Sequence, residues 1–165
     1  MTTAGEQLVT DRIPKELVSS ALFLLKRLGM TAKEQTLEAY EGTGLHPYHH
    51  AILAVLDEGS RETQGAIADA LNYDRGQLVG LLDELESAGL VERRRDPADR
   101  RRHVVQMTAA GRKALARLRL LSAGVESEFL APLDEGERAL LHGLLLRLAL
   151  EHLPTCRSGN GEPKR

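Results

Sequence analysis

Apolar residues recur at helical spacing near the start of the chain, and polar residues around them mark where helices begin and end. The segment 13–28 places leucines on one broad face and has Pro14 at an early position, where a helix tolerates proline. A second helix is expected from Thr31, because Thr31 and Glu34 have the spacing of a capping box, and it should stop at Gly42. The apolar face of the first helix is wider than one monomer usually needs.

Three shorter helices follow, each with its own start or stop signal. The segment 47–58 repeats apolar residues at helical spacing and is ended by a glycine. A helix over 63–71 is followed by a short polar break, after which Asp74 and Gln77 fit a capping box. The helix that starts there meets Gly89, in the position of a left-handed C-terminal residue. The pattern therefore predicts a helix-turn-helix.

Two short segments with β-branched residues, 90–94 and 102–108, come directly after these helices. Residues 96–99, Asp-Pro-Ala-Asp, separate them and have turn chemistry at both ends. This alternation of strand and turn signals predicts a β-hairpin.

The last third of the chain returns to helical periodicity. Thr108 should cap a long helix that ends near Leu130, and Asp134 with Glu137 forms a further capping box before a leucine-rich helix. Residues 154–165 are polar and are expected to form a disordered tail. The expected fold is thus mainly α, with a small β-hairpin.

Positive charge is concentrated in the predicted hairpin. The chain has a formal net charge of −2, yet residues 93–102 contain six arginines and two aspartates, which leaves the rest of the chain near −6. A basic tip on an otherwise acidic protein points to a negatively charged partner that meets this part of the surface.

Composition narrows the class of protein. Aromatic residues are 3% of the chain and tryptophan is absent, so binding that depends on stacking of bases is not expected. The single Cys156 excludes an intramolecular disulfide and suits a reducing compartment. The start of the chain has no signal-peptide pattern, and no apolar run approaches the ~20 residues of a membrane span. A cytoplasmic protein without a membrane partner is expected.

The run DRGQLVGLLDELESAGLVERRRDPADRRRHVVQMTAAG resembles the MarR family of transcriptional regulators. The family motif reads roughly L-D-x-L-E-x-x-G-L-V-x-R, then D-x-x-D-x-R, then V-x-L-T-x-x-G, and the likeness extends over about residues 44–111. The resemblance implies a winged helix-turn-helix over 46–108, with N- and C-terminal dimerisation helices over 1–45 and 109–153. It also implies a homodimer on a palindromic DNA operator, most simply a repressor, that a phenolic or aromatic-acid effector releases.

The wing arginines follow from the same resemblance. Arg101 is implied to enter the minor groove while Asp99 orients it, and a planar guanidinium suits a narrow, electronegative groove. An arginine-rich hairpin that is merely a soluble tip is the alternative. Phosphate contacts are expected from Arg93, Arg94, Arg95, Arg100 and Arg102.

The first turns of the second helix of the helix-turn-helix depart from the family. Val79 and Gly80 stand where relatives usually carry a Thr-Arg pair. This leaves Asp74, Arg75 and Gln77 as the polar candidates that face the major groove, with Arg75 suited to guanine or phosphate and Gln77 to adenine. A cap of the helix is an equal alternative for Gln77.

The resemblance also implies a crevice for an effector between the dimerisation helices and the winged helix. The candidates to line it are Phe23, Arg27, Met30, Tyr48 and His49. For Phe23 and Met30, a place in an ordinary core is the alternative.

Other classes of function have less support. A metal-responsive regulator would use the His46–His50 cluster with further ligands, and a winged-helix module that binds protein would use the same fold without DNA. The sequence has no nucleophile motif and no Gly-rich phosphate loop, so an enzyme is not expected, and neither is a cofactor. Oxidation sensing through Cys156, which lies in the polar tail, is not expected either.

Overall fold

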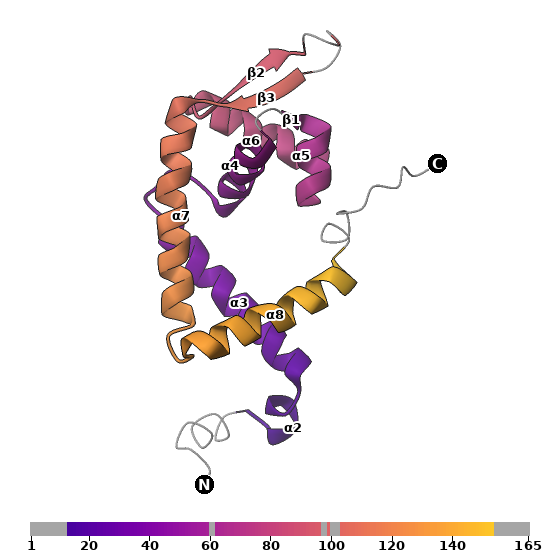
Figure 1. Cartoon of the computed structure of the whole chain (residues 1–165), viewed down its shortest axis with the longest axis vertical. Coiled ribbons are helices and arrows are strands. Elements are labelled where there is room, and N and C mark those ends of the chain that lie inside the picture. The colour runs from indigo at the N-terminus through magenta and orange to yellow at the C-terminus, as the bar shows by residue number, and fades with distance from the viewer. Residues whose placement is uncertain (1–12, 60–61, 97–98, 100–102, 154–165) are drawn as a thin grey trace, which may run out of the picture.

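The computed structural model describes residues 13–59, 62–96, 99 and 103–153, and it is mostly helical with one small antiparallel sheet. In Figure 1, the sheet and the helices α4, α5 and α6 form the upper part of the molecule, and the long helix α7 leads down from it to α3 and α8. This confirms the expected fold class. The elements are α2 (Lys15–Val18), α3 (Ala21–Tyr40), α4 (Pro47–Gly59), β1 (Glu62–Thr63), α5 (Gln64–Leu71), α6 (Arg75–Ser87), β2 (Val91–Arg95), β3 (His103–Met107), α7 (Ala109–Phe129) and α8 (Glu135–His152).

The N-terminal helices are divided differently from the sequence prediction. A single helix, α3, continues through Thr31, whose hydroxyl donates to the carbonyl of Arg27 instead of capping a new helix. The break lies eleven residues earlier, where the Ser20 side chain accepts a hydrogen bond from the backbone N–H of Phe23 at 3.3 Å. The predicted boundary was wrong because Ser20 and Thr31 are both capping residues and only Ser20 begins a helix. Gly29 does not break α3, because a single glycine inside a helix destabilises it by only about 1 kcal/mol.

The helix-turn-helix is confirmed, and its turn is set by local chemistry. Thr63 caps α5 by accepting from the N–H of Ala66, and Asn72 ends that helix in a left-handed conformation with φ of 53°. Asp74 then caps α6, and Gly89 follows that helix with φ of 69°, a conformation that costs glycine little.

The predicted hairpin is present and gains a third strand. Val91 pairs with Met107 at its base and Arg95 with His103 at its outer end. The two-residue strand β1 adds to the other edge of β3, where Glu62 pairs with Val105. A strand this short carries no periodicity, so sequence reading missed it.

The start of α7 is fastened to the base of the hairpin. Thr108 caps the helix through the N–H of Gly111, and its hydroxyl donates to the carbonyl of Gly89 at 2.7 Å. A Cβ on Gly111 would lie 2.1 Å from the carbonyl oxygen of Leu90, so this close approach requires glycine. The capping box of Asp134 and Glu137 at the start of α8 is also present.

The hydrophobic core lies inside the upper part of the molecule. The first half of α7 contributes to it, while the C-terminal part of that helix leaves it. Its largest fully buried side chains are Ile52, Leu53, Leu56, Ile67, Leu78, Leu82, Leu85, Val105 and Leu115.

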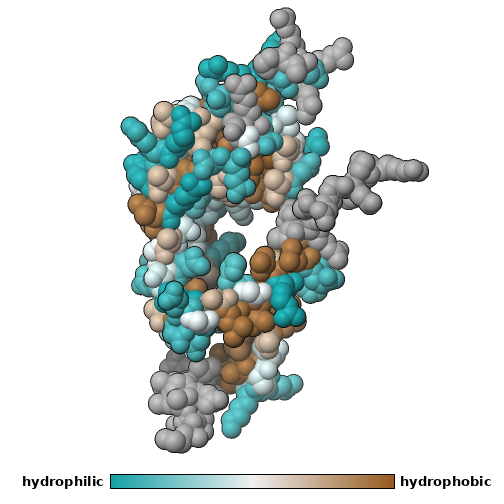
Figure 2. All heavy atoms as spheres, viewed as in Figure 1, coloured by the Kyte–Doolittle hydropathy of each residue, from teal (hydrophilic) through white to brown (hydrophobic). Residues whose placement is uncertain are grey.

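The helices outside this core keep much apolar surface exposed. No residue of α8 is buried, and in α3 Tyr40 alone is buried. Figure 2 shows hydrophobic surface gathered over the lower helices, where the exposed side chains include Leu22, Leu25, Leu28, Leu140, Leu144, Leu145 and Leu148. None of the helices in the described part of the chain is both long and apolar enough to cross a membrane.

Candidate nucleic-acid interface

Helix α6 buries one face and presents the other to solvent. Leu78, Leu82 and Leu85 point into the core, whereas Arg75 and Gln77 are exposed at its start. The helix therefore sits firmly on the core while its first turns remain accessible, which is the arrangement that a DNA recognition helix needs.

Asp74 holds the start of α6 in place. One of its carboxylate oxygens accepts from the N–H of Gly76 at 2.8 Å and from the N–H of Gln77 at 3.2 Å. The cap thus uses the backbone of Gln77 and leaves its side chain exposed. A carboxylate also suits the positive end of the helix dipole, so Asp74 has a structural role whatever else it contacts.

The middle of the exposed face of α6 carries only a small apolar side chain and a glycine. Val79 is 42% exposed, and a Cβ on Gly80 would meet nothing within 4 Å. A partner surface can therefore come close to the helix backbone at Gly80, while Val79 offers an apolar contact of the kind that a thymine methyl accepts.

The described part of the wing carries two exposed arginines at its outer end. Arg94 and Arg95 close strand β2, and the guanidinium of Arg94 lies 3.0 Å from a carboxylate oxygen of Glu92. Asp99 lies within the described part of the chain, and its side chain is exposed. The other expected wing contacts, Arg100, Arg101 and Arg102, lie outside the described residues.

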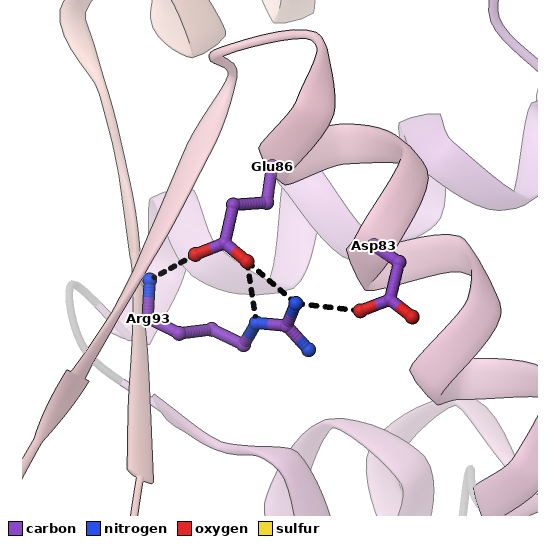
Figure 3. A network of polar contacts seen from close by, with 3 residues as sticks. All are labelled: Asp83, Glu86 and Arg93. Carbon is purple, nitrogen blue, oxygen red and sulfur yellow. Dashed lines mark hydrogen bonds and ion pairs between the residues drawn. The ribbon is translucent and has the colours of Figure 1, made fainter.

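Arg93 does something else, which corrects the expected phosphate contact. Its side chain turns back onto α6, where Nε donates to Glu86 at 2.8 Å and a terminal nitrogen donates to both Glu86 and Asp83 (Figure 3). Its backbone N–H donates to the same Glu86 carboxylate at 3.0 Å. The guanidinium thus fastens the base of the wing to the third turn of α6.

The charges in this contact stabilise one another. Hydrogen bonds from Arg93 lower the pKa of Glu86, and those to Glu86 and then Asp83 raise the pKa of Arg93. Charge-assisted bonds of this kind are stronger than neutral ones and fix orientation as well as distance. All three residues stand in the motif L-D-x-L-E-x-x-G-L-V-x-R, so the sequence contained the signal that this arginine is distinct from its neighbours.

The five residues expected to line an effector crevice are not brought together within one chain. Tyr48 and His49 lie in the first turn of α4, which contacts the end of α3 through Tyr40. Phe23 lies 17 residues before Tyr40, or roughly 25 Å along the helix axis at 1.5 Å per residue. Arg27 and Met30 are exposed on the intervening turns of α3.

An apolar cavity of about 370 Å³ lies elsewhere, between α3, α7 and α8. We call it the bundle groove. Its described lining includes none of the five residues expected for the effector. It is lined by Leu25, Leu28, Gly29, Ala32 and Thr36 of α3, Ser122, Val125, Glu126, Phe129 and Leu130 around α7, and Leu141 and Leu145 of α8.

His49 is buried and bridges two helices of the winged-helix part. It is 3% exposed, and its Nε2 lies 2.9 Å from a carboxylate oxygen of Glu84 on α6. Burial lowers the pKa of His49, and the nearby Glu84 opposes this effect. Across residues 13–59, 62–96, 99 and 103–153, no group of three or more histidine, cysteine, aspartate or glutamate side chains is placed to hold a metal ion.

A helix-turn-helix with an exposed second helix, followed by a hairpin with exposed arginines, defines a winged-helix DNA-binding protein. The sequence model of the MarR family matches residues 43–102. A protein of Thauera aromatica described as a "putative transcriptional regulatory protein for hcr operon" is 35% identical over 127 residues, which are 76% of this chain and 76% of that protein. The chain belongs to the MarR family of transcriptional regulators.

Solved structures agree in fold. The transcriptional repressor CouR bound to a 23-mer DNA duplex is 33% identical, with a TM-score of 0.75 over 82% of this chain and 96% of that chain. CouR from Rhodococcus jostii RHA1 bound to p-coumaroyl-CoA is 27% identical, with a TM-score of 0.71 over 84% and 95% of the two chains. These relatives are regulators of transcription, and nothing in them indicates catalysis.

Proposed function

We propose that this protein is a homodimeric transcriptional repressor that binds a palindromic operator and leaves it when an aromatic effector binds. The observation that carries the proposal is the joint placement of α6 and the wing. The exposed start of α6 and the arginine-rich hairpin are fixed to one another by Arg93, so they meet DNA as one surface.

The dimer is supported by the apolar surface outside the core. The leucines of α3 and α8 and the bundle groove leave hydrophobic side chains uncovered along both helices, and a contiguous exposed apolar surface of this kind is typical of an interaction site. A second copy covers such a surface with two-fold symmetry and places the two α6 helices in successive major grooves, about 34 Å apart. On this proposal, 46–108 meets DNA, and 1–45 with 109–153 form the dimer.

The contacts with DNA divide between two grooves. Arg75, Gln77 and Val79 on α6 face base edges in the major groove, and Asp74 shapes the helix that presents them. Arg94, Arg95 and Arg100 contact phosphates, and each contact steepens the dependence of affinity on salt. Arg101, oriented by Asp99, enters the minor groove of an A·T-rich flank.

The effector is proposed to be an aromatic acid or its thioester. A structural relative is bound to p-coumaroyl-CoA, and the exposed Tyr48 supplies an aromatic side chain on α4, where it meets α3. His49, which was expected beside it, is 3% exposed and lies against Glu84, so its ring is not available to an effector in this arrangement. Because Phe23 lies roughly 25 Å from this point along α3, the proposal has Phe23, Arg27 and Met30 reach the site from the α3 of the second copy.

Fluorescence anisotropy with the DNA upstream of the protein's own gene tests this function. We expect tighter binding to that duplex than to a scrambled duplex of equal length, and an affinity that falls steeply with salt. Equal affinity for both duplexes, or no dependence on salt, would contradict it. A panel of aromatic acids and their CoA thioesters, added to the complex, then tests release.

A further inference from the structure

The first turn of α4 is capped by two histidines instead of the usual hydroxyl or carboxylate side chains. His46, the residue before the helix, accepts a hydrogen bond on Nδ1 from the N–H of Tyr48 at 3.2 Å. His49 reaches back, and its Nδ1 accepts from the N–H of His46 at 3.0 Å. The pair reproduces the reciprocal logic of a capping box, with imidazoles as the acceptors.

These acceptor roles fix the protonation state of His49. An imidazole nitrogen accepts a hydrogen bond only when it carries no proton, so Nδ1 of His49 is unprotonated and its single proton lies on Nε2. That Nε2 lies 2.9 Å from a carboxylate oxygen of Glu84, although the angle of this approach does not make it a hydrogen bond. A neutral His49 therefore keeps the cap at Nδ1 while its Nε2 stays in close contact with Glu84.

Through these contacts one turn of α4 supports both ends of the recognition helix. His49 reaches Glu84 in the third turn of α6, next to Asp83, which binds Arg93 of the wing. The ring of Tyr48 packs edge-on against Tyr73, with centroids 5.2 Å apart, immediately before the Asp74 cap. The recognition helix is thus fastened to the wing on one side and to α4 on the other.

We propose that His49 is a positioning residue for the recognition helix, and that operator affinity falls when its imidazole takes up a proton. The proposal rests on the DNA-binding function proposed above. In this proposal, His49 does not contact DNA. Its side chain acts through Glu84 and through the start of α4.

The physical reason is a conflict that arises on protonation. An imidazolium would present Nδ1–H to the N–H of His46, so two donors would face one another and the cap would be lost. The added charge would be buried and close to the positive end of the α4 dipole. Breaking the cap and turning the ring removes the support of α6 on this side.

The surrounding groups set the direction of the pH effect. Glu84 on α6 favours the charged imidazole, whereas burial and the neighbouring His46 oppose it, and burial dominates, so the pKa of His49 lies below its ordinary value. Tyr40 of α3 and Arg119 of α7 face the adjacent His50, whose pKa burial also lowers. Affinity should therefore stay level above pH ~6.5 and decline below it.

The test is operator affinity measured at pH 7.5 and pH 5.5 at matched ionic strength. The wild type should bind the operator about fivefold or more weakly at pH 5.5 than at pH 7.5, because the proton on His49 breaks the cap. His49→Gln offers the same acceptor and donor without titrating, and should change less than about threefold over the same range. His103→Gln in the wing is the matched control, because it removes an exposed histidine beside the DNA and should leave the wild-type decline in place.

Two further measurements keep the proposal open to refutation. In Glu84→Gln the group that favours the imidazolium is lost, so the midpoint of the decline should move to lower pH. An equal decline in wild type and His49→Gln, or a midpoint unmoved in Glu84→Gln, overturns the proposal. If the wild type shows no operator preference at pH 7.5, the DNA-binding function fails instead. In that case, the link between His49 and α6 is tested by NMR, with the backbone amides of α6 followed as His49 titrates. If none of these amides shifts, the proposed positioning role of His49 is overturned.

Discussion

Arg93 donates three hydrogen bonds to Glu86, one from its backbone N–H and two from its guanidinium, and so ties strand β2 to the recognition helix at both oxygens of one carboxylate. A single hydrogen bond would fix the distance between wing and helix; two bonds from one residue also fix the angle. The orientation of the wing relative to α6 is therefore fixed, although β2 is an edge strand of the sheet.

The Arg93 contact should contribute to stability and to DNA binding together. Arg93→Ala should lower the free energy of unfolding by about 1–2 kcal/mol, because it leaves Glu86 and Asp83 without their charged donor. It should also weaken operator binding by loosening the wing. Urea denaturation and anisotropy measure the two effects. Arg94→Ala is the control, since its exposed pair with Glu92 should change stability by less than about 0.5 kcal/mol.

The same contact predicts how stability responds to acid. Because the pKa of Glu86 is lowered in the folded protein, the stabilisation is complete above the ordinary pKa of glutamate, about 4.3, and is lost as the pH falls through the lower folded value. The difference in melting temperature between wild type and Arg93→Ala should therefore be largest at pH 6 and should shrink as the pH falls to 3. A gap between the two proteins that persists undiminished at pH 3 would contradict this account.

The Asp74 cap can be separated from a contact with DNA. Asp74→Ala should reduce the free energy of unfolding by about 1 kcal/mol, whereas Asp74→Ser, which keeps a capping oxygen, should lose much less. If Asp74 acts through the cap, the serine variant should also keep most of its operator affinity. Loss of affinity in Asp74→Ser with stability unchanged would instead indicate a direct role at the DNA.

The proposed contacts with the two grooves should differ in what they discriminate. Arg75→Ala should cost roughly 1–3 kcal/mol on the operator and much less on a scrambled duplex. Arg101→Ala should relax the preference for A·T-rich flanks. Arg94→Ala should weaken binding to all duplexes alike and reduce the salt slope by about one. Competition binding with a set of operator variants measures these differences, and the same pattern of losses in all three proteins would refute the division.

The dimer proposal predicts the response of α8 to a charge. Leu145 lines the bundle groove, so Leu145→Glu should convert the dimer to monomer or to aggregate, as judged by sedimentation equilibrium, and DNA affinity should fall with it. Arg147→Glu introduces a negative charge two residues further along the same helix, where the wild-type side chain is already exposed and charged. That variant should remain dimeric. A wild-type protein that sediments as a monomer would remove the basis of the proposal.

The elements that sequence predicted well are those set by local chemistry. Asp74, Thr108 and Asp134 each cap the helix assigned to them, because an N-cap depends on a few neighbouring residues. The error at Thr31 has the same origin. Ser20 and Thr31 are both capping residues, and periodicity does not decide between them, so the pattern placed the break in the middle of α3.

The roles that sequence missed depend on contacts between distant segments. Arg93 stands in a row of similar arginines; the family motif marks its position, but its pairing with Asp83 and Glu86 is seen only once β2 has folded back along α6. The separation of Phe23 from His49 likewise follows from the unbroken length of α3, which the predicted helix boundary had concealed.

Helix α7 packs in the hydrophobic core at its N-terminal end and lines the bundle groove at its C-terminal end, so a tilt of this helix moves the two regions relative to one another. Leu115 is sealed in the core beside α6, whereas Val125 and Phe129 line the bundle groove, and one continuous helix of 21 residues joins them. A rod of this length spans about 30 Å, so a tilt of about 5° at its lower end moves its upper end by roughly 2–3 Å. In the two-fold dimer proposed above, equal tilts of the two α7 helices would change the spacing of the two α6 helices by about twice that amount. A repacking of a few side chains in the bundle groove would then be sufficient to shift the two α6 helices away from the spacing of successive major grooves.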